Sequence, residues 1–213
     1  EGINLPMITT LHGTDITLVG NHPFYKTAVT FSINKSDFVT SVSQSLKDDT
    51  LKLFNIKNEI QVIPNFIELD KNTIDPSISC RRSVMATENE RIITHISNFR
   101  KVKRIPDVIK IFYKIQQQIP AKLMMVGDGP EKEKAEYLCE ELGIQDKVIF
   151  FGNSNEIDKI LSYTDLFLLP SETESFGLAA LEAMAWSVPV ISSNSGGLPE
   201  VNIQGVTGFL SDP

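Results

Sequence analysis

The sequence lacks the features that mark membrane, nucleic-acid-binding and disulfide-rich proteins. None of its apolar runs approaches the roughly 18 residues that suggest a transmembrane helix. Its 20 lysines and arginines are outnumbered by 27 aspartates and glutamates, and no basic block occurs, so we expect no nucleic-acid partner. The two cysteines, Cys80 and Cys139, lie far apart and match no metal-ligand spacing, so we predict free thiols in a reducing compartment, the cytoplasm.

Other features that the sequence lacks exclude further classes of protein. No G-x-G-x-x-G follows a predicted strand, which disfavours a Rossmann dehydrogenase. No acidic cluster of a metal-binding kind occurs, so no metal is predicted. The chain shows no signal peptide, no internal repeat and no low-complexity segment. It does not begin with methionine and ends at residues 211–213 without a predicted closing helix, so we interpret it as part of a longer enzyme.

Predicted strands and helices alternate in two series, which favours an α/β fold with parallel sheets. The first series fills residues 1–67 and the second fills residues 90–213. Residues 68–89 between them are polar and lack clear periodicity, so we predict an irregular linker there. The predicted strands are 7–11, 38–42, 60–63, 92–96, 121–126, 147–151, 166–169 and 188–191, and the predicted helices follow Pro23 and span 44–54, 106–118, 131–142, 157–162 and 178–186.

Two glutamates stand at one predicted strand-to-helix junction. Glu174 follows the strand at 166–169, and Glu182 lies eight positions later in the helix at 178–186. Ligands of open α/β sheets bind at the carboxyl ends of the strands, where this junction lies. If the interval were all helical, the acids would be about 12 Å apart along the helix axis, suited to opposite ends of one hydroxyl-rich ligand. The alternative is that neither acid binds a ligand, with Glu174 on a surface loop and Glu182 on the solvated face of a helix. Taken alone, the pair of acids fits both interpretations equally well.

Glycines follow two other predicted strands. Gly196 and Gly197 precede a helix start, where exposed backbone N–H groups form an anion site. Gly127 and Gly129 permit close approach of a ligand to the backbone. For both pairs an ordinary turn is the alternative interpretation.

A basic turn, residues 100–104, follows the predicted strand at 92–96. It carries four cations, of which Arg100 and Lys103 are our candidates for phosphate contacts. An arginine binds phosphate through its planar fork and a lysine as a point charge, and both stabilise a leaving diphosphate as its charge develops. A solvated basic turn is the alternative.

Together these elements resemble the retaining glycosyltransferases of family four, which have the GT-B fold of two Rossmann-like domains. The family signature is E-x7-E, then a Pro-Val strand and a G-G-x-P-E loop, and Glu174, Glu182, Pro189-Val190 and residues 196–200 match it in order and spacing. Residues 9–17 and 96–104 further resemble the bacillithiol-type subgroup, and this resemblance covers essentially the whole chain. It implies a partial N-terminal, acceptor-side domain and most of a C-terminal, donor-binding domain.

The resemblance also implies roles for single residues. In the family the first glutamate contacts the transferred sugar and the second holds the ribose, which implies these roles for Glu174 and Glu182. Arg100 and Lys103 would stabilise the diphosphate, although Asn98 stands where the common pattern has arginine, as in the bacillithiol-type subgroup. The further residues implied in donor binding are Gly13, Asn98, Gly127, Gly129, Phe176, Gly177, Leu178, Gly196 and Gly197.

Histidines and one aspartate complete the candidates. His12 follows the first predicted strand, and the resemblance implies a place near the donor sugar and the reaction centre. A buried structural histidine is the alternative for His12. Asp15 is predicted to be a capping or supporting group rather than a catalytic acid, and His22 and His95 are predicted to be structural.

The reaction implied by the resemblance is transfer of N-acetylglucosamine from UDP-N-acetylglucosamine to L-malate, with retention at the anomeric carbon and without a metal or cofactor. The implied partners are a nucleotide-sugar donor and a small hydroxy acid, and homo-oligomerisation stays open. Two alternatives remain: a related transferase with another donor or acceptor, and a non-catalytic domain that binds a nucleotide sugar.

Overall fold

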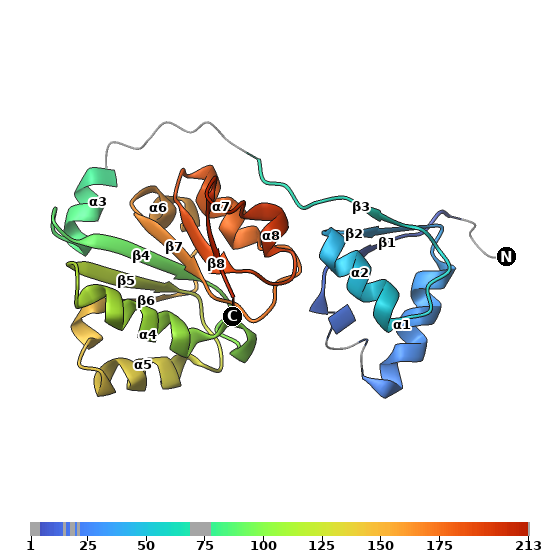
Figure 1. Cartoon of the computed structure of the whole chain (residues 1–213), viewed down its shortest axis with the longest axis horizontal. Coiled ribbons are helices and arrows are strands. Elements are labelled where there is room, and N and C mark those ends of the chain that lie inside the picture. Colours follow the sequence, from blue (N-terminus) through green and yellow to red (C-terminus); the bar gives the residue numbers. More distant parts are fainter. Residues whose placement is uncertain (1–4, 15, 18–19, 21, 69–77, 213) are drawn as a thin grey trace. The chain divides into compact units, whose positions relative to one another are not determined.

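The computed structural model describes residues 5–14, 16–17, 20, 22–68 and 78–212, and the chain forms two compact units (Figure 1). The first unit consists of Glu1–Phe66 with two short later segments, Glu174–Gly177 and Gly196–Val201. The second unit holds the rest of the chain. Both units contain parallel sheets, which confirms the predicted α/β class.

The first unit contains a three-stranded parallel sheet in the order β1-β2-β3. Proline at the start of α1 suits a helix start because its φ angle is already helical and its missing N–H is not needed there. Helix α2 begins after Ser43, whose side chain accepts a hydrogen bond from the backbone N–H of Leu46. The elements are β1 (Ile8–Leu11), α1 (Pro23–Lys35), β2 (Phe38–Ser41), α2 (Gln44–Leu53), β3 (Ile60–Val62) and, from the later segment, α8 (Leu198–Val201).

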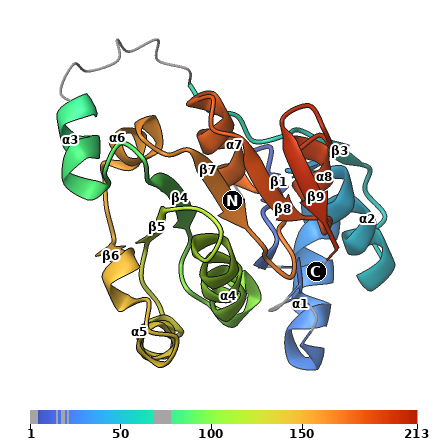
Figure 2. The same ribbon diagram turned by 60° about the vertical axis from the view of Figure 1, so that its left-hand side comes forward.

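The second unit contains a six-stranded parallel sheet in the order β6-β5-β4-β7-β8-β9. Helices α4 and α5 cover one face of this sheet, and α6 and α7 lie on the other (Figures 1 and 2). The elements are α3 (Ile78–Met85), β4 (Arg91–Ile96), the 3-10 turn η2 (Lys101–Lys103), α4 (Ile105–Gln116), β5 (Ala121–Val126), α5 (Lys132–Glu141), η3 (Gln145–Lys147), β6 (Val148–Gly152), α6 (Ile157–Ser162), β7 (Leu166–Leu169), α7 (Leu178–Ala185), β8 (Val190–Ser193) and β9 (Gly208–Ser211).

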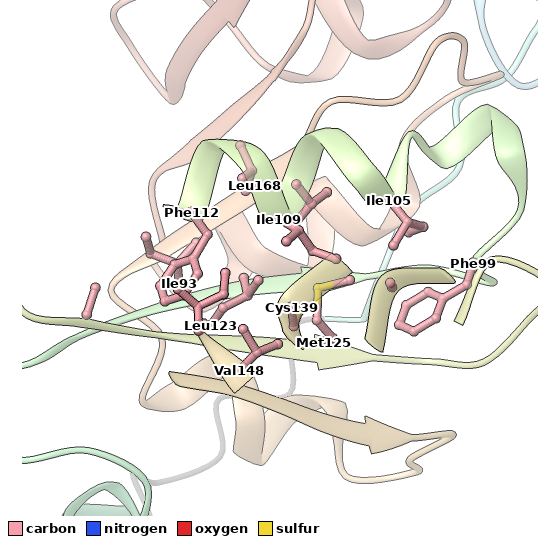
Figure 3. Packing of buried hydrophobic residues seen from close by; sticks show 14 residues of the cluster. Ile93, Phe99, Ile105, Ile109, Phe112, Leu123, Met125, Cys139, Val148 and Leu168 are labelled. Atoms are coloured by element: carbon pink, nitrogen blue, oxygen red, sulfur yellow. The ribbon is translucent and has the colours of Figure 1, made fainter. Parts of the chain in front are cut away.

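The core of the second unit lies between α4, α5 and the sheet (Figure 3). Ile105, Ile109 and Phe112 recur on one face of α4 and pack over the strands, including Leu123 of β5. Burying such a side chain stabilises a fold by about 1.5–3 kcal/mol. The buried thiol of Cys139 from α5 belongs to the same core, and burial, with the charges of Glu136 and Glu140, raises its pKa to about 11. This core fixes the strands from which the candidate loops depart.

The structure differs from the predictions at three points. Residues 68–89 are not irregular throughout, because α3 lies within them, and β9 was not predicted. Strand β8 begins at Val190 rather than at residue 188. Helix α7 begins at Leu178, as predicted; residues 174–177 are therefore not helical, and the separation of about 12 Å that an all-helical interval would give to Glu174 and Glu182 does not apply. Among the described residues, no helix is both long enough and apolar enough to cross a membrane.

Candidate functional site

The loops that follow β4, β5, β7 and β8 all leave the sheet of the second unit at its carboxyl edge, because the strands are parallel neighbours. These loops carry most of the site residues predicted from the sequence; His12 and Gly13 follow β1 instead, and Leu178 and Glu182 lie on α7. Ligands of open parallel sheets bind at such an edge.

The basic turn after β4 is a short 3-10 helix with Arg100 at its N-cap position. The backbone N–H of Lys103 donates to the carbonyl of Arg100 at 2.8 Å, and the N–H of Glu172 donates to the carbonyl of Val102 at 2.8 Å. Arg104 has a left-handed backbone and forms an ion pair with Asp107, 2.6 Å from Nε to Oδ2. Arg100 is exposed and Lys103 is half-buried, so the two predicted phosphate ligands lie at the surface of a turn with a defined backbone.

The glycines after β5 are required by a loop-to-loop contact. Gly127 and Gly129 have φ angles of +121° and +156°, which residues with a side chain rarely adopt. A Cβ on Gly127 would lie 1.8 Å from the carbonyl oxygen of Ser97, and one on Gly129 would lie 2.4 Å from that of Asn98. These two glycines therefore let the loop after β5 press against the loop after β4.

The Gly-Gly loop is packed in the same way against the segment of the first glutamate. The N–H of Gly197 donates to the carbonyl of Glu174 at 2.7 Å. A Cβ on Gly196 would lie 2.1 Å from that carbonyl oxygen, and one on Gly197 would lie 2.4 Å from the carbonyl oxygen of Ser175. The first unit thus brings the two halves of the sequence signature into direct contact.

The segment after β1 belongs to this cluster. Gly13 has a φ angle of +124°, and a Cβ there would lie 1.9 Å from Oγ of Ser175. His12 is exposed, so the alternative of a buried structural histidine is wrong. Asp15 lies outside the described residues, whereas exposed His22 caps α1 by accepting a hydrogen bond from the N–H of Phe24.

The residues between the two glutamates differ in burial. Phe176 and Gly177 are buried, whereas Leu178, the first residue of α7, is exposed. Glu182 is half-buried on α7. Burial raises the pKa of Glu182, and the charge of Asp158 on α6 raises it further. An ionised Glu182 is therefore costly by itself, and hydroxyl groups of a ligand that donate to it would offset that cost.

Two contacts of the first unit were not predicted from the sequence. Oγ of Ser43 donates to the carbonyl of Ser175 at 2.5 Å. The carboxylate of Glu200 accepts hydrogen bonds from the N–H groups of Gln44 and Ser45, each at 2.8 Å, at the first turn of α2. A serine before a helical pattern is a local signal for the helix cap at Ser43. No local signal predicts that Ser43 also binds Ser175, which lies 132 positions later in the chain.

A cavity of about 510 Å³ lies away from these loops, near the end of α4. It is lined by Arg91 and Asp165 among other residues, but by no predicted site residue. Asp165 already pairs with Arg82 and Arg91, so its charge is satisfied within the protein. We therefore place the candidate site at the carboxyl edge. Within the part of the chain that the structure describes, no group of three or more His, Cys, Asp or Glu residues could hold a metal ion.

The chain is similar to several known proteins. The chain is 44% identical over 211 residues to the N-acetyl-alpha-D-glucosaminyl L-malate synthase of Bacillus anthracis, an alignment covering 99% of this chain and 55% of that protein. The crystal structure of Anabaena Alr3699/HepE in complex with UDP-glucose has a TM-score of 0.86 at 23% identity, covering 98% of this chain and 58% of that one. Sucrose-phosphate synthase from Thermosynechococcus elongatus has a TM-score of 0.84 at 23% identity, covering 99% and 56%.

The chain thus spans somewhat more than half the length of these proteins. The model of a glycosyltransferase family 4 domain matches residues 2–71. The model of the glycosyl transferases group 1 matches residues 79–213, which is more than half of the chain. The fold is accordingly of the GT-B type, and the chain belongs to the glycosyl transferases of group 1.

Proposed function

We propose that the protein is a retaining glycosyltransferase that transfers N-acetylglucosamine from UDP-N-acetylglucosamine to L-malate. The observation that carries this proposal is the 44% identity to an N-acetyl-alpha-D-glucosaminyl L-malate synthase across 99% of the chain. Residues 1–67 would form part of the acceptor-side domain, residues 68–89 the linker, and residues 90–213 the donor-binding domain. A free, buried Cys139 is compatible with the cytoplasmic location that we expect.

The proposed donor site uses the loops at the carboxyl edge. Arg100 and Lys103 would contact the diphosphate, and Glu182 would accept hydrogen bonds from the ribose hydroxyls. Glu174 would orient the hydroxyls of the transferred sugar, and His12 would lie near the reaction centre. The other proposed contacts come from Gly13, Asn98, Gly127, Gly129, Phe176, Gly177, Leu178, Gly196 and Gly197.

The proposed reaction breaks the bond between the anomeric carbon and the diphosphate oxygen and forms a bond from that carbon to the malate hydroxyl oxygen. Both events take place on the same face of the sugar, so the configuration is retained. The hydroxyl proton passes to the leaving phosphate oxygen, and the products are the glycosylated malate and UDP. Positioning and charge stabilisation supply the catalysis, with the two cations of the basic turn in place of a metal.

Mass analysis of the products tests this proposal. The full-length protein is incubated with UDP-N-acetylglucosamine, UDP-glucose or GDP-mannose, each with L-malate or another hydroxy acid. We expect the mass of N-acetylglucosaminyl malate in one pairing, and a Glu174→Gln variant should lose turnover while keeping its affinity for UDP. A product from another pairing would instead favour the related transferase, which the UDP-glucose complex of Anabaena Alr3699/HepE keeps open. Tight binding of a UDP-sugar without transfer or hydrolysis would favour a binding domain.

A further inference from the structure

A fully buried histidine stands where β4 meets the basic turn. His95 has no exposed surface, as expected for a structural residue. Its two ring nitrogens nevertheless make polar contacts with different elements. Nδ1 lies 2.8 Å from the carbonyl oxygen of Leu168 on β7, and Nε2 lies 2.8 Å from Oγ of Ser97, the first residue after β4.

The chemistry of these partners determines where the protons lie. A carbonyl oxygen only accepts hydrogen bonds, so Nδ1 of His95 must carry a proton. Burial lowers the pKa of His95 to about 4; the hydrogen bond to Leu168 opposes this shift, and the charge of Lys103 adds to it. The ring is therefore neutral at pH 7, so Nε2 has a lone pair and Ser97 must donate its hydroxyl proton to it.

Ser97 in turn begins a segment that is held from several sides. Its N–H donates to the carbonyl of Val126 at 3.0 Å. Its carbonyl oxygen lies so close to Gly127 that a Cβ on that residue would be only 1.8 Å away. Phe99 is fully buried, its ring centroid lies 6.2 Å from that of His95, and its carbonyl accepts from the N–H of Glu131 at 3.0 Å. This segment is the base from which the basic turn projects.

We propose that His95 is a positioning residue for the basic turn: its ring links Ser97 to the backbone of β7 and so holds Arg100 and Lys103 at the carboxyl edge of the sheet. This inference rests on the proposed function, because it gives the two cations a diphosphate to bind. A histidine that merely fills space would stabilise the fold without affecting how the turn presents its charges.

Matched variants separate these two roles in the full-length protein. His95→Phe keeps a ring of similar size but removes both hydrogen bonds, and Ser97→Ala is the milder change in case the first variant folds poorly. Thr94→Val is the control, because Thr94 is the preceding residue of β4, is fully buried and also loses a hydroxyl contact, 2.7 Å to Oγ1 of Thr164. Successive strand residues face opposite sides of a sheet, so Thr94 points away from His95.

Calorimetry with UDP and with uridine provides the functional measurement. We expect His95→Phe and Ser97→Ala to weaken UDP binding about 10-fold, the loss of roughly one hydrogen-bonded positioning contact, and to leave uridine binding unchanged. Thr94→Val should change neither affinity. Wild-type UDP affinity in both test variants, or equal weakening of UDP and uridine, would overturn the positioning role.

Amide hydrogen exchange measures the same role without any ligand. The N–H groups of Lys103 and Arg104 donate within the turn, at 2.8 and 3.0 Å, so their exchange reports on its order. His95→Phe should speed their exchange at least about 10-fold relative to Thr94→Val, in line with the loss of a positioning contact. Equal exchange in the two variants would refute the inference. A wild-type protein that binds no UDP would instead count against the proposed function, and exchange would still decide the role of His95.

Discussion

The two units of the chain secure their candidate residues by different means. In the second unit, Phe99, Phe112 and Phe167 are fully buried, and the loops at the sheet edge start from strands held by this core. In the first unit, Phe24 and Phe38 are 87% and 64% exposed, and its candidate residues are joined mainly by polar contacts and by glycines pressed against backbone. The comparison shows that fully buried aromatic rings support the strands beneath one set of loops, whereas aliphatic residues such as Leu11, Val39 and Ile60 form the buried core of the other unit. Close contacts between glycines and backbone occur in both units.

The largest expected effect tests the core of the second unit. Phe112→Ala should lower the free energy of unfolding by about 3–5 kcal/mol, because it removes a buried ring and leaves a cavity. Phe24→Ala, the exposed counterpart in the first unit, should change it by no more than about 0.5 kcal/mol. Far-UV circular dichroism during urea unfolding measures this difference, because both units contain helices. Equal effects of the two variants would remove the contrast between the units.

The next effect concerns the cations that the second unit presents. Arg100→Ala and Lys103→Ala should each weaken UDP binding about 10- to 150-fold, because a hydrogen bond to a charged group is worth roughly 1.5–3 kcal/mol. Exposed Lys101 in the same turn is the control, and Lys101→Ala should have little effect. Titration calorimetry with UDP and uridine makes the comparison. If uridine weakened as much as UDP, the turn would support the fold rather than contact the diphosphate.

A smaller effect is expected where the first unit depends on polar contacts. Glu200→Ala removes the acceptor of two backbone N–H groups at the start of α2, which should destabilise the first unit by about 0.5–2 kcal/mol, as for loss of a helix cap. Asp48→Ala is the control, since Asp48 accepts a hydrogen bond from the side chain of Gln44, four residues earlier on α2, rather than from a backbone N–H at the helix start. Amide exchange in α2 measures the difference. No change with Glu200→Ala would show that these hydrogen bonds do not stabilise the helix.

The smallest effect concerns the stability that the second unit loses when half-buried Glu182 is ionised. The folded-state pKa of Glu182 is raised, so its protonated form favours the folded state and that stability is lost as pH rises through the folded pKa. Glu182→Gln should therefore be slightly more stable than the wild type at pH 7, by less than about 1 kcal/mol for a half-exposed group. The difference should vanish below about pH 4, where the wild-type residue is protonated in both states.

Thermal unfolding of Glu182→Gln and of the wild type, at pH 7 and below about pH 4, tests this prediction. Glu172→Gln is the control, because Glu172 is exposed. Glu182→Gln should also bind UDP more weakly, which would separate the cost in stability from the gain in binding. A loss of stability at pH 7 in Glu182→Gln would contradict the predicted sign.

Elements with a strong local pattern were predictable from the sequence. The buried strands β5 and β7 and the helix α4 have apolar runs or a helical period that packing then uses directly. Helix α3 was not predictable, because tertiary contacts help to hold it: Arg82 donates to the carbonyl of Tyr163 at 2.7 Å and forms an ion pair with Asp165. Strand β9 is as short as β7, but its sequence Gly-Phe-Leu-Ser lacks the continuous apolar run of β7, and the strand is defined by pairing with β8.

The sequence by itself determined which chemical groups stand at the ends of the parallel strands, because strand order along the chain and the direction of each strand follow from local patterns. The tertiary structure decided what those groups touch. Gly127 faces Ser97, Gly196 faces Glu174, and His95 joins Leu168 of β7 to Ser97. Such contacts link residues far apart in the chain, and their distances depend on how the strands and loops pack, which no local pattern of residues specifies.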